Sequence, residues 1–460
     1  MDQKIEQQRY RDDRARLRTL SYASRALLIS FALLASYLLP PFDASAKADS
    51  FTAPWADALV RWDVFHFAQI ARGGYQYEHQ WAFFPGLPWL LRATALSEME
   101  YLLGGVLLVL LCDTTLVMYD LSLLVLGNRD AALLSAMLSL LPSSPATLRL
   151  VPYAEPFFTY LSYRGMLFCA RKHWLYAAIS FALAGAFRSN GVTLAGFLLW
   201  GMLVAPILEG RARVIRLSTI LKCVTYVALV FAPFVYHQYT GYRAFCSTPM
   251  DAPLASTDGR PSSAADTIPS WCTNTLPLIY SHVQSAYWNV GFLRYWTLQQ
   301  LPNFIIAAPP LAAILFFAFW HLRRMIPGYV AVLGGYARKD KYVSRPASSP
   351  PSAAFASTFS PPRTSPSLAP FLSPALTPHG LHATFMALVL IFASHVQIVL
   401  RFAAAMPATY WAGAWLLGKK ESARGGKKSA GWSWGRLWVA WSVVWGALSV
   451  LLWVAFLPPA

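Results

Sequence analysis

Long apolar segments recur along the whole chain, and they limit its possible folds more than any other feature. A helix that crosses a membrane needs about 20 predominantly apolar residues. Only 13% of the 460 residues are charged, against about 25% in an average soluble domain. The sequence therefore predicts an all-α, polytopic helical membrane protein with about 11 spans (9–13), in a single membrane domain over residues 1–460. The predicted spans lie near 24–42, 102–126, 131–143, 156–170, 174–188, 192–208, 221–237, 302–320, 383–400, 404–417 and 437–457.

Lys and Arg are distributed unevenly between the segments that connect these spans. If the N-terminus is cytoplasmic, alternate connections hold 27 of the 38 Lys and Arg residues. Such enrichment marks cytoplasmic loops, so topology explains the net charge of +17 and no nucleic-acid partner is expected. The charged stretch 1–25 predicts an uncleaved signal-anchor helix. The basic connections are 1–25, 127–130, 171–173, 209–222, 321–382 and 418–436.

Polar residues that loop solvation does not explain gather on the opposite, non-cytoplasmic side. They occur around Asp63, in the segment 142–156, around Arg188, in the loop 238–301 and in the segment 401–407. Functional polar groups of membrane bundles face the protein interior or a water-filled cavity. We therefore expect one site, formed by several loops on the non-cytoplasmic side.

The first non-cytoplasmic connection carries the candidate catalytic residues Asp63, His66 and Glu78, close to the aromatic run 82–85. A carboxylate beside a bilayer is costly and marks a functional site. Asp63 and His66 are three residues apart and share one face of a helix, so they could position a hydroxyl group and accept its proton. The alternative is that Asp63 only caps a juxtamembrane helix.

Further candidates lie near predicted helix ends on the same side. Arg188 and Arg401 carry the planar guanidinium group that suits phosphate, although Arg401 could instead reach out to the membrane interface. Glu155 could serve a site or only cap a helix. The aromatic stretch 287–304 predicts an interfacial amphipathic helix whose rings could bind a sugar or only anchor the chain. The candidate substrate-binding residues are Trp62, Glu155, Arg188, Asn190, Trp288, Arg294, His395, Gln397 and Arg401.

The sequence lacks the usual motifs of nucleotide and zinc sites. It contains no GxxxxGK[ST], no GxGxxG after a strand, no HExxH and no CxxC. We therefore predict no metal and no cofactor, and a substrate that is itself carried by the membrane.

Two smaller features complete the sequence. Cys246 and Cys272 lie in one polar loop and could pair if that loop faces an oxidising compartment, but sequence alone gives no geometry for the pair.

Nine of the 36 residues in 345–380 are proline. Such a composition predicts a disordered Ser/Pro-rich cytoplasmic insert.

The polar blocks, in this order, resemble the fungal GPI mannosyltransferase 2 family. The resemblance rests on 62–88, 153–155, 188–191, 287–304 and 395–411, and omits only the two ends and the insert. It implies a GT-C-like membrane enzyme of the endoplasmic reticulum, with luminal loops forming the active site. Such an enzyme adds the second mannose of the GPI-anchor precursor in α-1,6 linkage, with dolichyl-phosphate mannose as donor. Membrane lipids and a small accessory membrane subunit are the further partners that it implies.

The same resemblance makes Asp63 the acid of the first luminal loop. We expect a direct inverting displacement in which Asp63 orients or deprotonates the acceptor hydroxyl, while His66 and Glu78 shape the site. Arg188 or Arg401 would stabilise the departing lipid phosphate.

Other functions stay open at this point. Another dolichol-dependent glycosyltransferase, acting on N-glycan precursors, would share the donor and differ in the acceptor. A transporter or scramblase is disfavoured because transporters often contain internal repeats and midplane sites, whereas this sequence shows no repeat and clusters its polar residues on one side. A non-catalytic subunit would tolerate the loss of Asp63.

Overall fold

The computed structural model describes residues 2–42, 58–94, 98–210, 215–247, 269–333, 366–422 and 433–457. These residues contain helices and no strand, in agreement with the predicted all-α class. The α-helices are α1 (Asp2–Leu38), α3 (Asp63–Gly73), α4 (Gly86–Thr94), α5 (Glu98–Leu111), α6 (Thr114–Leu126), α7 (Arg129–Leu138), α8 (Pro145–Arg149), α9 (Ala154–Ala170), α10 (Trp174–Gly185), α11 (Ala195–Leu199), α12 (Ala205–Leu208), α13 (Leu217–Phe245), α14 (Ile279–Ala286), α15 (Leu301–Leu333), α17 (Thr377–Phe392), α18 (Val399–Phe402), α19 (Pro407–Ser422) and α20 (Trp434–Val454).

Seven helical stretches within the described residues are long and apolar enough to cross a membrane. A polytopic helical membrane protein is thereby confirmed, whereas the predicted number of 11 spans is not. Each predicted span coincides with helix, but four of these helices are shorter than the roughly 20 residues of a full span. The short ones are α7, α9, α10 and α19, with 10, 17, 12 and 16 residues.

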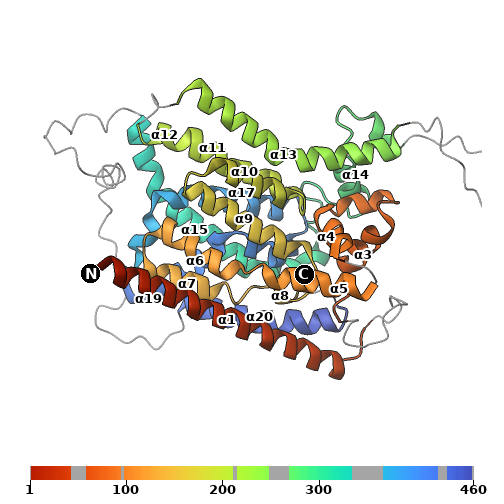
Figure 1. Cartoon of the computed structure of the whole chain (residues 1–460), viewed down its shortest axis with the longest axis horizontal. Helices are drawn as coiled ribbons and strands as arrows, with labels where there is room; N and C mark the ends of the chain where they lie inside the picture. Colours follow the sequence, from red (N-terminus) through yellow and green to blue (C-terminus); the bar gives the residue numbers. More distant parts are fainter. Residues whose placement is uncertain are drawn as a thin grey trace, which may run out of the picture.

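The long helices run alongside one another in a bundle with two different ends (Figure 1). The start of α1 and the short helix α12 lie at one end, and α3, α4 and α14 lie at the other. Within the bundle α9 packs on α6 and α10, α10 packs on α13, and α15 packs on α17. The short helices at the second end therefore cap the bundle instead of crossing it.

Ion pairs fasten α1 to the hairpin of α6 and α7. Arg129 donates to both carboxylate oxygens of Asp13 at 2.6 and 2.7 Å, and the Tyr119 hydroxyl donates to the same carboxylate at 2.6 Å. Arg14 Nη1 lies 2.5 Å from Asp120 Oδ2. These contacts bring the predicted cytoplasmic segments 1–25 and 127–130 to one end of the bundle.

Close packing of α9 on α10 depends on a small residue. A Cβ atom added to Gly165 of α9 would come within 2.3–2.9 Å of the Phe181 ring of α10. Small residues let membrane helices approach closely, and van der Waals contact then holds them together. One end of each of these two helices lies beside the site described below.

The prediction of disorder for residues 345–380 is corrected for residues 366–380. Residues 334–365 lie outside the described residues, but 366–376 form the short 3-10 helices η8 (Pro366–Leu372) and η9 (Pro374–Leu376), and α17 begins at Thr377. Phe371 and Leu376 are buried, and His321 of α15 donates to the Phe371 carbonyl at 3.0 Å. The prediction of disorder is wrong here because a few apolar side chains find a packing partner that overall composition does not reveal.

Cys246 and Cys272, whose pairing the sequence leaves open, form a disulfide in the structure, with their Cα atoms 5.5 Å apart. It joins the end of α13 to the 3-10 helix η5 (Ser270–Thr273). Cys112, Cys169 and Cys223 are free thiols.

Candidate active site

A cavity of about 410 Å³ opens between helices at the end of the bundle that α3 and α14 cap. Its walls come from segments far apart in the sequence. They include Asp63, His66, Phe83, Phe84, Tyr153, Glu155, Phe187, Arg188, Ser189, Asn190, Tyr280, Gln284, Trp288, Leu390, Ser394, His395, Arg401 and Phe402.

Asp63 forms a three-membered cluster with Tyr153 and Arg401. The Tyr153 hydroxyl donates to Asp63 Oδ2 at 2.5 Å, and Arg401 Nη1 donates to the same oxygen at 2.9 Å. Arg401 Nη1 also lies 2.7 Å from the Tyr153 hydroxyl. Among the described residues, both hydrogen bonds to this carboxylate reach Oδ2, so Oδ1 is left for a substrate hydroxyl.

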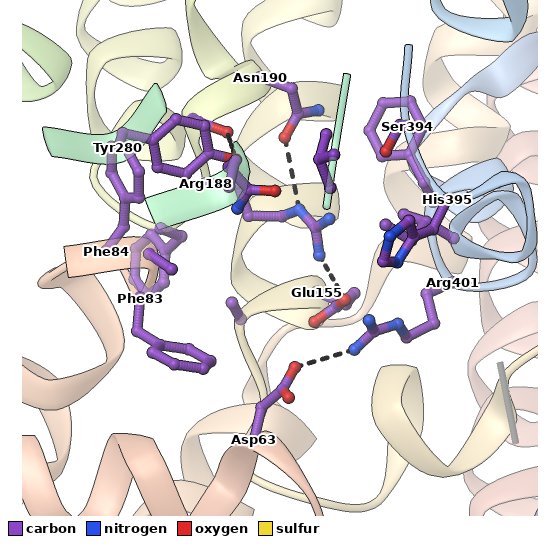
Figure 2. A pocket seen from close by; sticks show the side chains of 18 of the residues that line it. Asp63, Phe83, Phe84, Glu155, Arg188, Asn190, Tyr280, Ser394, His395 and Arg401 are labelled. Atoms are coloured by element: carbon purple, nitrogen blue, oxygen red, sulfur yellow. Dashed lines mark hydrogen bonds and ion pairs between the residues drawn. The ribbon is translucent and has the colours of Figure 1, made fainter. Parts of the chain in front are cut away.

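The capping alternative for Asp63 does not hold in the structure. Asp63 is the first residue of α3, and the cap position belongs to Trp62, which makes no side-chain capping bond. The Asp63 side chain turns toward Arg401 instead (Figure 2).

The surroundings of Asp63 keep it ionised. Burial raises the pKa of the Asp63 carboxyl, but the charge of Arg401 and the hydrogen bonds from Tyr153 and Arg401 lower it more, so the net pKa lies below its ordinary value. Burial also lowers the pKa of the neighbouring His66, against the pull of Asp63. At neutral pH the cavity thus holds a carboxylate next to a neutral imidazole.

A second ion pair lies deeper in the cavity. Glu155 is only 2% exposed, and Arg188 Nη1 donates to its Oε1. Arg188 also contacts the amide oxygen of Asn190 at 3.4 Å. Glu155 Oε2 and Asn190 Nδ2 are buried and have no hydrogen-bond partner among the described residues. A bound ligand would supply the missing partners, because buried polar groups are almost always hydrogen-bonded.

The two ion pairs point toward the same space (Figure 2). Asp63 and Glu155 supply two negative charges, and Arg401 and Arg188 supply two positive charges. Guanidinium groups bind phosphate through charge-assisted hydrogen bonds, and a free carboxylate oxygen can accept a proton. The cavity therefore offers both functions that group transfer from a phosphate ester requires.

Aromatic residues form the wall opposite these charges. Phe83 and Phe84 precede α4, which starts directly against α10, since Gly86 N donates to the Ala186 carbonyl at 2.7 Å. A Cβ atom at Gly86 would lie 2.8 Å from that carbonyl oxygen, so a side chain there would push α4 away. This close approach brings Phe83 and Phe84 to the cavity that Arg188 also lines.

Eight of the twelve residues predicted from the sequence line the cavity. They are Asp63, His66, Glu155, Arg188, Asn190, Trp288, His395 and Arg401. The other four, Trp62, Glu78, Arg294 and Gln397, do not line the cavity. Trp62 packs on Phe456 at 5.3 Å between ring centroids.

Glu78, predicted as a catalytic residue, belongs to a separate cluster. Its Oε1 accepts from Trp271 Nε1 at 2.8 Å, and its Oε2 lies 3.2 Å from the Tyr287 hydroxyl and 3.5 Å from His282 Nε2. These contacts connect η1 (Glu78–Ala82) to α14 and η5. The position of Glu78 fits a positioning role.

Tyr153 is absent from the site residues predicted from the sequence, although its hydroxyl contacts both Asp63 and Arg401. The feature of the sequence that could have indicated Tyr153 is its place two residues before the candidate Glu155. Ser189, Tyr280 and Gln284 were also missed. The Ser189 hydroxyl donates to the Tyr280 hydroxyl at 2.7 Å, a contact across 91 residues that no local pattern predicts.

Comparison with known proteins identifies the family. The family model described as Mannosyltransferase (PIG-V) matches residues 30–460. The chain belongs to this family. The cavity residues named above, from Asp63 to Phe402, all lie within the matched region.

Relatives of the PIG-V family resemble the chain along most of its length. GPI mannosyltransferase 2 of Cryptococcus neoformans is 33% identical, over 95% of this chain and 96% of that protein. GPI alpha-1,6-mannosyltransferase 2 of Homo sapiens is 30% identical, over 91% and 88%. The mouse protein of the same name is 36% identical, over 66% and 65%.

Among solved structures, the archaeal oligosaccharyltransferase AglB from Archaeoglobus fulgidus is similar at a TM-score of 0.33 and 12% identity, over 95% of this chain and 55% of that one. This likeness is too weak to carry an argument about fold.

Proposed function

We propose that the chain transfers the second mannose of the GPI-anchor precursor, in α-1,6 linkage, from dolichyl-phosphate mannose. Membership of the PIG-V mannosyltransferase family and the names of the relatives support this activity. The observation that carries the proposal is the cavity in which Asp63–Arg401 and Glu155–Arg188 face one another. A carboxylate with a free oxygen beside two guanidinium groups suits the transfer of a sugar from a lipid phosphate.

In the proposed reaction Asp63 is the general base. The acceptor hydroxyl oxygen attacks the anomeric carbon of the donor mannose, and its proton passes to Asp63 Oδ1. The bond between that carbon and the phosphate oxygen breaks, and its electron pair leaves with dolichyl phosphate. A single displacement of this kind inverts the anomeric configuration.

Arg401 and Arg188 stabilise the leaving phosphate in this scheme. Charge builds up on the phosphate oxygens as the bond breaks, and fixed cationic donors in a partly buried site lower the energy of that state. Each guanidinium is held by a carboxylate, so neither must reorganise during the reaction. Glu155 Oε2 and Asn190 Nδ2 are free to bind the hydroxyl groups of the donor sugar.

We further propose that this site faces the lumen of the endoplasmic reticulum and that the N-terminus is cytoplasmic. The distribution of Lys and Arg supports this orientation. The disulfide between Cys246 and Cys272 supports it independently, because disulfides persist in oxidising compartments. A GT-C-like fold and a small accessory membrane subunit remain expectations from the resemblance.

The test is mannose transfer in microsomes that contain the full-length protein, with the expected accessory membrane subunit supplied. Labelled dolichyl-phosphate mannose is the donor, and a GPI intermediate with one mannose is the acceptor. We expect transfer by the wild type and a loss of at least about 100-fold in Asp63→Asn, since general-base catalysis contributes about 10²–10⁴-fold. Asparagine keeps an oxygen for Tyr153 and Arg401, so the fold is retained. Near-normal turnover by Asp63→Asn would exclude the base role.

The acceptor separates this proposal from its rival. A dolichol-dependent glycosyltransferase of N-glycan precursors would use the same donor and leave the GPI intermediate unmodified. Transfer to an N-glycan precursor, with none to the GPI intermediate, would replace the proposed function by that alternative.

A metal-independent reaction is the second expectation. Two arginines supply the cationic charge that a divalent ion would otherwise supply. Transfer should therefore persist in excess EDTA. A loss of turnover in EDTA that Mn²⁺ or Mg²⁺ restores would contradict it.

A further inference from the structure

Ring contacts continue from the cavity to the surface at the capped end of the bundle. His66 stacks on Phe83 at 4.6 Å between ring centroids, and both residues line the cavity. The His79 ring meets His66 edge-on at 5.8 Å, and it stacks on Tyr77 at 5.8 Å with nearly parallel planes. The Tyr287 ring is tilted against the His79 ring, with 6.1 Å between ring centroids. We name these five residues, Phe83, His66, His79, Tyr77 and Tyr287, the aromatic track.

The outer end of the aromatic track is open to solvent. Tyr77 is 56% exposed and Tyr287 is 51% exposed. The track comprises residues of α3 and η1, the two residues that flank η1 and the residue after α14, and none of them belongs to a candidate membrane span. Its rings therefore form a continuous series of contacts outside the spans, from the cavity to the surface.

Hydrogen bonds hold this exposed surface in place. Gln80 Oε1 accepts from the backbone N–H groups of Gln76 and Tyr77 at 2.6 and 3.1 Å. The Tyr75 hydroxyl donates to the Phe83 carbonyl at 2.6 Å. The backbone on both sides of η1 is thus fixed, although the Tyr77 ring is free to make new contacts.

Glu78 holds the two halves of the track together. Its carboxylate accepts from the Tyr287 hydroxyl and from Trp271, and Trp271 precedes the disulfide-bonded Cys272. This arrangement gives a structural reason for an acidic residue outside the cavity. Rigid aromatic side chains bind with little loss of conformational entropy.

We infer that the aromatic track is the subsite that binds the glycan of the acceptor. The inference rests on the proposed function and names where its acceptor lies. One face of a sugar ring presents C–H groups and packs on an aromatic ring, while its hydroxyl groups find polar partners at the edges. His66, His79 and the Tyr77 hydroxyl supply such partners along the track.

The charges of the cavity assign the track to the acceptor and not to the donor. The donor phosphate belongs beside Arg401 and Arg188, whereas the rings of the track offer no guanidinium or ammonium group to hold it. The acceptor must bring a hydroxyl to Asp63, while the rest of its glycan extends away from the reacting atoms. The track begins at His66, one helical turn from Asp63, and leads outward.

The test compares Tyr77→Ala and His79→Ala with wild type in the full-length protein. The Michaelis constants for the GPI intermediate and for dolichyl-phosphate mannose are measured separately. We expect Tyr77→Ala to raise the acceptor KM about tenfold with the donor KM unchanged. Tyr77→Phe keeps the ring and should recover most of the lost acceptor affinity.

Tyr176→Ala is the matched control. Tyr176 is 59% exposed and lies on α10 at the start of that helix, outside the track. Tyr176→Ala should leave the acceptor KM and the donor KM unchanged. This result would show that the loss of an exposed tyrosine ring has no general effect. Unaltered thermal unfolding of Tyr77→Ala shows that the variant is folded.

A shortened acceptor gives a second readout. An acceptor that presents only the mannose and lipid, without the inner sugars, cannot occupy the full track. Wild type and Tyr77→Ala should then differ by less than about twofold in acceptor KM.

If wild type transfers mannose, three outcomes would overturn the inference. The first is an unchanged acceptor KM in both alanine variants, and the second is an equal rise of the acceptor KM and the donor KM. The third is a change in thermal unfolding alone, which would mark the tyrosines as interfacial anchors. A folded wild type that does not modify the GPI intermediate would instead refute the proposed function, and this inference with it.

Discussion

At the scale of single residues, Arg401 and Tyr153 together set the state of the Asp63 carboxylate. Burial raises the pKa of Asp63, and the charge of Arg401 and the hydrogen bond from the Tyr153 hydroxyl lower it more. Both residues also fix the position of its Oδ2. A base whose pKa is lowered is weak but fully ionised at neutral pH, and the free Oδ1 remains available to a hydroxyl. For the proposed proton transfer, the free Oδ1 and the fixed charges around it matter more than the basicity of the carboxylate.

Tyr153→Phe should shift the pH dependence of transfer. The Tyr153 hydroxyl bond lowers the pKa of Asp63, so its removal raises that pKa. Transfer needs the ionised carboxylate and fails as pH falls through its pKa. The acidic limb of kcat/KM, which in wild type lies below the ordinary pKa of an aspartate, should therefore move to higher pH, as measured by initial rates from pH 8 down to the lowest pH at which the protein stays folded.

Tyr163→Phe is the control for that experiment. Tyr163 is also buried, but its hydroxyl donates to the Ala404 carbonyl and lies outside the cavity lining. Its acidic limb should coincide with that of wild type. An identical shift in both variants would mean that general destabilisation, and not the Asp63 contact, moves the profile.

At the scale of elements, two buried arginines attach α1 to the rest of the bundle. Arg25 donates to the carbonyl groups of Val109, Cys112 and Arg149 at 3.2–3.4 Å. Arg149 donates to Ser21 and Ser24 of α1 at 2.8–3.1 Å. Carbonyl groups at the ends of α5 and α8 carry the negative end of the helix dipole, which compensates the charge of Arg25.

Arg25→Ala should destabilise the protein by about 2–4 kcal/mol, because hydrogen bonds to charged groups contribute about 1.5–3 kcal/mol and buried carbonyl groups lose their partner. Arg18→Ala on the exposed face of α1 is the control, with a change within about 0.5 kcal/mol. Unfolding in detergent micelles measures both. Equal midpoints for the two variants would show that Arg25 does not hold α1 in place.

At the scale of the whole molecule, one end of the bundle carries the cavity and the disulfide, and the start of α1 and the short helix α12 lie at the other. If the proposed orientation is correct, a glycosylation acceptor Asn-Gly-Thr inserted after Ala255 is modified in microsomes, and the same insertion after Ser352 is not. Glycosylation of each insertion variant is measured as a shift in gel mobility that endoglycosidase H removes. Modification after Ser352 alone would reverse the orientation.

The membrane class, the helical elements and most of the candidate charges could be predicted from the sequence. These follow from residue type and local order, since apolar runs form helices in a bilayer and charges prefer one side. The sequence did not reveal that residues 366–380 pack, because composition hides a few well-placed apolar side chains. Nor could it find Tyr153, or separate Asp63 from Glu78, which occur in one short segment and belong to different clusters.

Helix packing brings Asp63 of α3 against Arg401 of α18, 338 residues away, and places Cys246 and Cys272 within bonding distance at the end of α13. Such contacts depend on how each helix is tilted and how closely small residues let it approach its neighbours. Lipid tails are as apolar as the side chains of a span, so apolar character alone does not select which helix faces meet or which partner each face finds. The pairing of charges across the cavity is therefore a property of packing geometry, which no local pattern of residues contains.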